Sequence, residues 1–202
     1  QGAGLETDHP PIVAVNEHSA DPHYVPSKQK HTPIRANDFV LIDLWAKQAK
    51  PGAIFADITW TGYVGSSVPD EYVEIFNIVR DARDAAIEAV RKARATDTPI
   101  RGCQVDDACR QVIADAGFGE YFIHRTGHSI HEVGHGNGAN IDNLETQDDR
   151  RLIPRTCFSI EPGIYLPGRF GVRSEVDVYL PDDGSVLVTG PNPQRDIVKI
   201  LG

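Results

Sequence analysis

"DFVLIDLWAKQAKPGAIFADITWTGYV" (residues 38–64) consists of two β-rich runs separated by "KQAKPG". Such runs on either side of a Pro-Gly bend predict a β-hairpin. A second hairpin is predicted at residues 157–180, "CFSIEPGIYLPGRFGVRSEVDVYL", across the bend at Pro167–Gly168. The chain therefore contains two hairpins of similar design that lie far apart in the sequence.

Both hairpins carry acidic residues at matched positions. Asp43 and Asp57 lie on the two strands of the first hairpin, and Glu161 and Glu175 lie on those of the second, each pair fourteen residues apart. A carboxylate inside an apolar strand is costly to bury unless it is paired or binds a metal. Two facing hairpins would bring four carboxylates together, and such a cluster requires cations. Four carboxylates supply enough bridging oxygens for two divalent ions.

The remaining segments predict two helices and several short strands. Residues 70–95 have apolar residues at helical spacing, with Asp70 as the expected N-cap, and residues 104–117 form a second helix that ends at Gly117. The start of the chain predicts a strand at "PPIVA" and a long loop. "SVLVTG" and "RDIVKIL" predict closing strands.

Composition limits the kinds of protein that this chain can be. Its 202 residues, 40% apolar and 24% charged, are enough for one domain with a sizeable core. The net charge of −9 argues against a nucleic-acid or anionic-membrane partner, because both require basic surface. No apolar run approaches the roughly 18 residues of a membrane helix.

The cysteines and the first residues bear on the compartment and the processing of the chain. Cys103, Cys109 and Cys157 are an odd number at no zinc-site spacing, so we expect reduced thiols. The chain has no methionine and begins "QGAGLETDHP", which indicates a processed chain or a fragment. It shows no basic-then-apolar leader, and we expect a cytoplasmic protein.

Residues 124–135, "HRTGHSIHEVGH", contain four of the eight histidines. "HEVGH" fits the HExxH pattern of zinc proteases, in which Glu132 would be the general base. That pattern requires a helix that places both histidines on one face. Three glycines at 134, 136 and 138 disfavour a helix, and the third ligand of the extended pattern would fall at Ile141, which cannot bind metal. We therefore expect the HExxH match to be coincidental.

Several of these motifs together resemble one metallopeptidase family. "LID" followed by "DIT", "HRTGH" with a histidine seven residues later, "IEPGIY" and "VRSE" are similar to the family of methionine aminopeptidase, aminopeptidase P, prolidase and creatinase. The resemblance extends from about residue 10 to the C-terminus. It implies an α+β "pita-bread" fold with two αβ halves related by a pseudo-twofold axis, and a single catalytic domain over residues 1–202.

The resemblance also implies a role for each site residue. Asp43 would chelate one metal ion, Asp57 and Glu175 would bridge two, and His128 and Glu161 would complete the second site. Two divalent ions, manganese or cobalt or else zinc, would hold a bridging hydroxide as the nucleophile, with Glu161 as its general base. The substrate-side residues would be His124, His135, His23 and Arg173, whereas His9, His18 and His31 are expected to be solvated.

The implied activity is that of an exopeptidase that hydrolyses the bond after an N-terminal residue, with proline next in the peptide. A creatinase-like enzyme and a non-catalytic binding member of the same fold remain open as alternatives.

The chain departs from the family at several places: His131 replaces a small glycine, Trp60 replaces an arginine, the hairpin between Asp43 and Asp57 is longer, and the two helices expected before "PPIVA" are absent. The first half would then leave one sheet face bare, so we expect a homodimer or a complex with a missing N-terminal segment.

Overall fold

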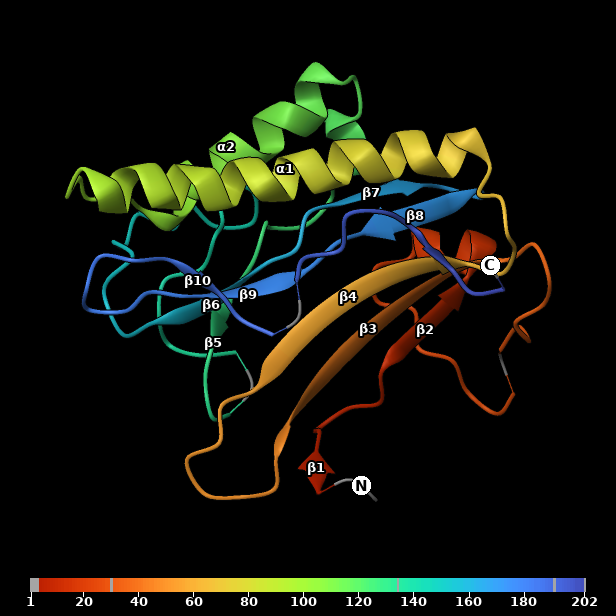
Figure 1. Ribbon diagram of the computed structural model, residues 1–202, viewed down its shortest axis with the longest axis horizontal. Coiled ribbons are helices and arrows are strands. Elements are labelled where there is room, and N and C mark those ends of the chain that lie inside the picture. Colours follow the sequence, from red (N-terminus) through yellow and green to blue (C-terminus); the bar gives the residue numbers. More distant parts are fainter. Residues whose placement is uncertain (1–3, 30, 134, 191, 202) are drawn as a thin grey trace.

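The computed structural model describes residues 4–29, 31–133, 135–190 and 192–201 of the chain. Two α-helices lie side by side along one face of the molecule, and a long curved hairpin extends away from them (Figure 1). The helices are α1 (Asp70–Ala95) and α2 (Gly102–Asp115), and short 3₁₀ helices lie at Asn16–Ala20 and Gly119–Tyr121. This mixture of antiparallel sheets and segregated helices is an α+β architecture.

The first hairpin forms the centre of the first sheet. Strand β3 (Phe39–Gln48) pairs antiparallel with β4 (Ala56–Tyr63), and Gly52 has the positive φ of +73° that the bend requires. Strands β1 (Leu5–Glu6) and β2 (Ile12–Val15) both pair with β3, and β11 (Val198–Lys199) runs parallel to β4. The predicted first hairpin is thus confirmed.

The second hairpin is present, but both of its strands are interrupted. Strands β7 (Gly163–Leu166) and β8 (Phe170–Arg173) pair across the Pro167–Gly168 bend. Strands β6 (Cys157–Ile160) and β9 (Val176–Tyr179) pair in a separate sheet, between β5 (Ser129–Ile130) and β10 (Leu187–Val188). The interruptions fall at residues 161–162 and 174–175, where the sequence alone predicted continuous strands.

The helices cover the second half of the chain. The apolar stripe of α1 is buried with Cys109 and Ile113 of α2 and with strands β6 to β9 in the main core. Asp70 is the first helical residue after Pro69, and its side chain makes no capping hydrogen bond, so the predicted N-cap was wrong by one residue. Its carboxylate still lies in the first turn, where the helix dipole favours negative charge.

The first sheet has a different environment from the second. Among residues 4–29 and 31–69 the structure shows strands and one 3₁₀ helix but no α-helix. In Figure 1, α1 and α2 lie along the top of the molecule and most of β3 lies below them, although Phe39 at the start of β3 stacks on Tyr72 of α1 at 4.8 Å. The side chains of Ile42 and Leu44 on β3 are 44% and 46% exposed, which agrees with the expected bare face.

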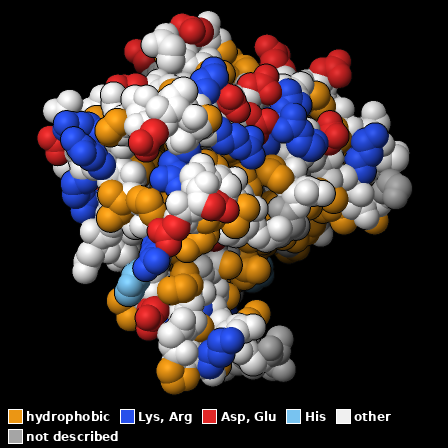
Figure 2. Space-filling view, turned by 60° about the vertical axis from the view of Figure 1, so that its left-hand side comes forward, with side chains coloured by type: hydrophobic (Ala, Val, Ile, Leu, Met, Phe, Trp, Pro, Cys, Tyr) orange, Lys and Arg blue, Asp and Glu red, His pale blue; other side chains and the backbone are white. Residues whose placement is uncertain are grey.

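The surface carries both signs of charge. On the face drawn in Figure 2, acidic and basic side chains are interspersed over the helical side, and hydrophobic side chains gather below them. Neither α1 nor α2, the α-helices in the described part of the chain, combines the length and the apolar character needed to cross a membrane. The three cysteines are free thiols, as predicted.

Candidate active site

The first hairpin presents Asp43 and Asp57 on its inner face. Asp43 pairs with Thr59 across the strands, and Asp57 pairs with Trp45, so the two carboxylates are diagonal neighbours on one side of the pleat. Asp57 is buried, and its backbone N–H donates to Oδ2 of Asp177 at 2.9 Å. The register of this hairpin therefore fixes both acids toward the second half of the chain.

The second hairpin presents its two acids at the interruptions of its strands. Glu161 follows β6, and its backbone N–H donates to the carbonyl of Thr126 at 2.7 Å. Glu175 precedes β9, and its backbone N–H donates to the carbonyl of Thr59 at 3.2 Å. This second bond joins the two hairpins directly, so the expectation that they face each other is confirmed.

The loop after α2 places His128 opposite these acids. The buried carboxylate of Asp106 accepts hydrogen bonds from the backbone N–H and hydroxyl of Thr126 at 2.9 and 2.6 Å. A Cβ at Gly127 would lie 1.9 Å from the carbonyl oxygen of Ser159, so only glycine permits this close approach. The backbone N–H of His128 donates to the hydroxyl of Ser159, and its carbonyl accepts from the Ser159 N–H.

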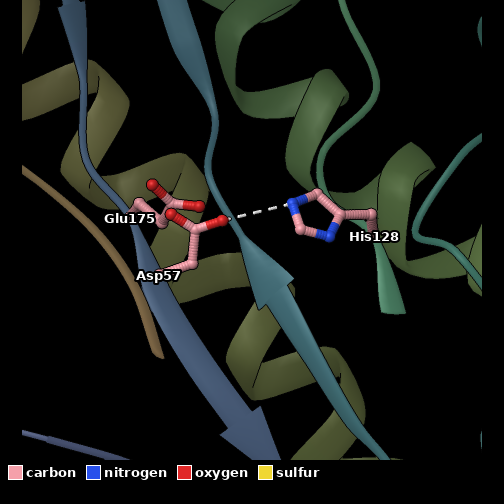
Figure 3. Close-up of side chains that lie close together, drawn as sticks. All are labelled: Asp57, His128 and Glu175. Atoms are coloured by element: carbon pink, nitrogen blue, oxygen red, sulfur yellow. Dashed lines mark ion pairs between the residues drawn. The ribbon is translucent and has the colours of Figure 1, made fainter. Parts of the chain in front are cut away.

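These segments bring one imidazole and three carboxylates together. Ligand atoms of Asp57, His128 and Glu175 all lie within 4.8 Å of one another. Figure 3 shows the two carboxylates beside each other, with the ring of His128 directed toward them. Nε2 of His128 lies 3.4 Å from Oδ2 of Asp57 and 3.4 Å from Oε1 of Glu161.

The electrostatics of this cluster favour a cation. Burial and the neighbouring Asp43 raise the pKa of Asp57 to about 8. Burial raises the pKa of Glu161 to about 7, with the charge of Asp57 acting in the same direction. Burial, with Asp57 and Glu161 nearby, also raises the pKa of Glu175 well above its ordinary value. Because like charges are crowded here, a divalent ion would stabilise the ionised carboxylates, and their oxygens with one imidazole are suitable ligands.

Arg173 lies in the wall of this site and connects several of its groups. It is almost fully buried, and each of its three nitrogens donates to the protein. Nη2 donates to Oδ2 of Asp43 at 2.5 Å, Nε donates to the hydroxyl of Thr59 at 3.0 Å, and Nη1 donates to the hydroxyl of Tyr165 at 2.9 Å. Thr59 in turn donates to Oε2 of Glu175 at 2.6 Å, so Arg173 orients acids from both hairpins.

The tautomer of His124 follows from its partners. Its Nδ1 lies 2.7 Å from the carbonyl oxygen of Arg125, so this nitrogen carries the proton. Its Nε2 carries no proton in this tautomer, so it accepts from the hydroxyl of Tyr165 at 2.7 Å, and the same hydroxyl oxygen accepts from Nη1 of Arg173. Burial, followed by the charge of Arg173, lowers the pKa of His124 to about 3.

The predicted site residues line one cavity of about 400 Å³. Its walls include all five predicted ligands, together with His23, His124, His135 and Arg173. The ring of His135 lies 4.1 Å from that of His128, measured between centroids. Burial and the neighbouring His128 lower the pKa of His135 to about 4.

The cavity also contains residues that the sequence did not single out: His9, Ile12, Pro22, Trp45, Arg125 and Glu145. His9 is exposed, as expected, and its ring also lines the cavity and stacks on Trp45 at 6.2 Å. The pairing of β1 with β3 brings this terminal segment across the hairpin, and no local motif indicates it. Arg125 belongs to the "HRTGH" motif, of which only the two histidines were predicted to be site residues.

The structure contradicts the HExxH interpretation, which requires a helix at this segment. Residues 131–133 and 135 are not helical, and Gly134 lies outside the described residues. His131 lines a different cavity, of about 500 Å³, with Ile54, Cys157 and Tyr179. Because His131 and His135 line different cavities, the structure does not support them as joint ligands of one zinc ion.

Residues 1–182 match the metallopeptidase family M24. The chain is 38% identical over 194 residues to the probable dipeptidase PepE of Mycobacterium tuberculosis, an alignment that covers 94% of this chain and 46% of that protein. It is 35% identical over 196 residues to the Xaa-Pro dipeptidase of Lactobacillus delbrueckii, covering 97% and 49%. The chain thus belongs to the M24 metallopeptidases, as its motifs indicated.

Solved structures agree with this assignment. Dipeptidase PepE from Mycobacterium ulcerans aligns with a TM-score of 0.78 at 35% identity, over 93% of this chain and 46% of that one. Prolidase from Thermococcus sibiricus aligns with a TM-score of 0.75 at 34% identity, over 94% and 47%. The fold is the pita-bread fold of this family, and the chain spans about half the length of the relatives that it matches.

Proposed function

We propose that the chain carries the catalytic site of a metal-dependent exopeptidase that hydrolyses the bond after an N-terminal residue when proline follows it. The observation that carries this proposal is the convergence of Asp57, His128, Glu161 and Glu175 in one buried site. Relatives named Xaa-Pro dipeptidase and Xaa-Pro aminopeptidase support the substrate class.

We propose that two divalent ions would be held by Asp43, Asp57, His128, Glu161 and Glu175, which all line the cavity. When bound, such ions would lower the pKa of a water nucleophile and polarise the scissile carbonyl. The carboxylates and imidazole suit manganese and cobalt, and also zinc.

The proton transfers of the reaction would be performed by side chains of the cavity. Glu161 takes the proton from the attacking water and passes it to the amine that leaves. A general base requires a pKa near the working pH, and burial of Glu161 moves its pKa in that direction.

His135 and His23 would line the path of the substrate, and His135 is neutral at pH 7 because its pKa is lowered to about 4. His124 and Arg173 were predicted to contact the substrate. In the structure both form hydrogen bonds with the hydroxyl of Tyr165. We therefore expect both to act mainly by orienting Asp43 and the wall of the site.

The test is hydrolysis of a peptide panel by protein loaded with manganese, cobalt or zinc. Ala-Pro peptides should be cleaved in preference to Ala-Ala peptides, and elemental analysis should approach two ions per chain. A chelator should abolish turnover, and a loaded protein that never exceeds one ion would contradict the two-ion proposal. Preference for N-terminal methionine, or turnover of creatine, would assign the chain to another branch of the family.

The exposed side of the first sheet also supports association. Ile42 and Leu44 lie on the outward face, where Ile42 pairs with Trp60 and Leu44 with Ile58 across the strands. We propose that this apolar face is covered in the working protein, by a second copy or by an N-terminal segment. Each of these relatives has further residues, about half of its length, that the alignment with this chain does not cover. A segment of that kind would be long enough to cover this face.

A further inference from the structure

The cavity that His131 lines is a second candidate binding site, separate from the proposed active site. It has a volume of about 500 Å³ and lies between the first hairpin, the loop that carries His131, and strands β6 and β9. Its apolar lining includes Ile54, Phe55, Ile130 and Tyr179. His131 and the longer first hairpin, which carries Ile54 and Phe55, are also features by which the chain departs from its family. Sites for small organic ligands have this size and an apolar, aromatic lining with few polar groups.

Asp177 is the acidic residue that lines this cavity. On β9 it alternates with Val176 and Val178, which are buried in the main core, so its side chain lies on the opposite face of the sheet, toward the first hairpin. Its Oδ2 accepts the backbone N–H of Asp57 at 2.9 Å. Its Oδ1 has no hydrogen-bond partner among the described residues, although Asp177 is only 5% exposed. A buried carboxylate oxygen without a partner is costly, so a ligand that donates to it would be stabilised there.

The charges around the cavity favour a cationic ligand. Arg155 lines the cavity, but it is exposed and its Nε donates to Oδ2 of Asp182 at 2.6 Å, so its charge is already paired. His131 is exposed and does not reach Oδ1 of Asp177. An ammonium group on an apolar body would therefore complement both the carboxylate and the aromatic rings, since the faces of such rings also attract cations.

The second cavity shares a wall with the proposed active site. Phe55, on its lining, stacks on Trp45 at 4.2 Å, and Trp45 lines the active-site cavity. The carboxylate of Asp177 holds the backbone of Asp57, a proposed metal ligand. An occupant of the second cavity would thus contact the same carboxylate that positions Asp57.

We propose that this cavity binds a small organic cation, a primary ammonium on an aromatic or aliphatic body, and that the ammonium group donates to Oδ1 of Asp177. The apolar body lies against Phe55 and Tyr179. This site is distinct from the substrate cavity, where the acids are proposed to hold metal ions.

The test measures the binding of 2-phenylethylamine and of its neutral isostere, 2-phenylethanol, to the whole chain by calorimetry. Manganese is present in excess to occupy the acids of the active-site cavity. The measurement is made at pH 8, above the pKa of about 7 that burial gives Asp177. Wild type should bind the amine at least ~10-fold more tightly than the alcohol, the scale of a hydrogen bond to a charged group. Equal affinities, or no binding of either probe, would overturn the proposal without recourse to a variant.

Three variants locate the binding site. Asp177→Asn removes the charge and keeps an oxygen for the N–H of Asp57, so it should weaken amine binding by at least ~10-fold and alcohol binding by less than ~3-fold. Cys157→Phe fills the cavity from β6 and should weaken the binding of both probes. Glu161→Gln is the matched control, because it makes the same acid-to-amide change in the active-site cavity, and it should leave the preference for the amine unchanged.

Two patterns among these variants contradict the assignment. If Asp177→Asn keeps the preference for the amine, the carboxylate of Asp177 does not recognise the cation. If Glu161→Gln loses amine binding and Asp177→Asn does not, the cation binds in the active-site cavity instead. None of these measurements requires turnover, so the outcome does not depend on the exopeptidase function proposed above.

Discussion

Glu161 and Glu132 lie in different environments, although either could serve as a general base on sequence grounds. Glu161 lies 3.4 Å from Nε2 of His128 inside the cavity, whereas Glu132 is exposed. Glu161→Gln removes a charged ligand and the proton acceptor, so kcat should fall by at least ~10²-fold. Glu132→Gln should change kcat by less than ~10-fold, under about 1.4 kcal/mol in the barrier. Steady-state kinetics on folded, metal-loaded variants measures both, and the reverse pattern would restore the HExxH interpretation.

His124 should make the stability of the protein depend on pH. Its pKa falls from 6.5 to about 3 on folding, so the unfolded chain binds a proton that the folded protein excludes. The contribution of His124 is therefore fully present above about pH 6.5 and is lost as the pH falls toward 3.

His124→Gln cannot take up this proton and can still make hydrogen bonds with Tyr165. The difference in unfolding free energy between wild type and this variant should shrink as the pH is lowered from 7 to 4, measured by urea denaturation. A difference that is constant over this range would show that His124 keeps an ordinary pKa in the folded protein.

Helix α1 supports the site through a single buried cation, Arg83. Its Nη1 donates to the hydroxyl of Ser174 at 2.7 Å and to the carbonyl of Gln194 at 3.0 Å. Ser174 lies between Arg173 and the ligand Glu175, at the interruption between β8 and β9. The helix thus holds the backbone that positions both residues.

Arg83→Met should destabilise the protein by about 2–4 kcal/mol, because two buried acceptors lose their donor. Arg91→Met, on the exposed side of the same helix, should change stability by no more than about 0.5 kcal/mol. Chemical denaturation of the two variants provides the comparison. Equal effects would mean that the buried contacts of Arg83 contribute nothing beyond helix propensity.

The interrupted strands show how elements, as well as residues, form the site. In the first hairpin the acids lie within continuous strands, and in the second they lie where β6 and β8 have just ended. The ladder is absent there, so the backbone N–H groups of Glu161 and Glu175 bond instead to Thr126 and Thr59. These bonds join the second hairpin to the histidine loop and to the first hairpin.

For the whole molecule, the uncovered side of the first sheet leads to a prediction about association. Ile42→Thr combined with Leu44→Thr should reduce concentration-dependent self-association and the binding of an apolar dye, since both changes reduce exposed apolar area and threonine is well suited to a strand. Ile153→Thr, at a residue that is 55% exposed elsewhere, is the control. Light scattering over a concentration series measures the effect. A wild type that stays monomeric and binds no dye would contradict the proposed covering.

The sequence alone determined both hairpins, both helices, the grouping of the four acids with His128, and the family. The hairpins, the helices and the grouping of the four acids follow from local information: strand periodicity, Pro-Gly bends, helical spacing, and acids that an apolar strand cannot hold without partners. The addition of His128 and the family assignment follow instead from the resemblance of the motifs to a known metallopeptidase family. It also excluded a helix at "HEVGH", because glycine propensity is a local property.

Tertiary structure alone decided which charged groups are free and which are engaged. Arg173 and Arg125 both line the cavity, yet Arg173 is buried with all its nitrogens bonded, whereas Arg125 is half-buried and its Nη2 lies 3.4 Å from Nδ1 of His135. His9 reaches the rim because β1 pairs with β3, and His131 turns to another cavity. Several of these differences depend on contacts between distant segments, such as Arg173 with Asp43, 130 residues apart, and no local pattern encodes them.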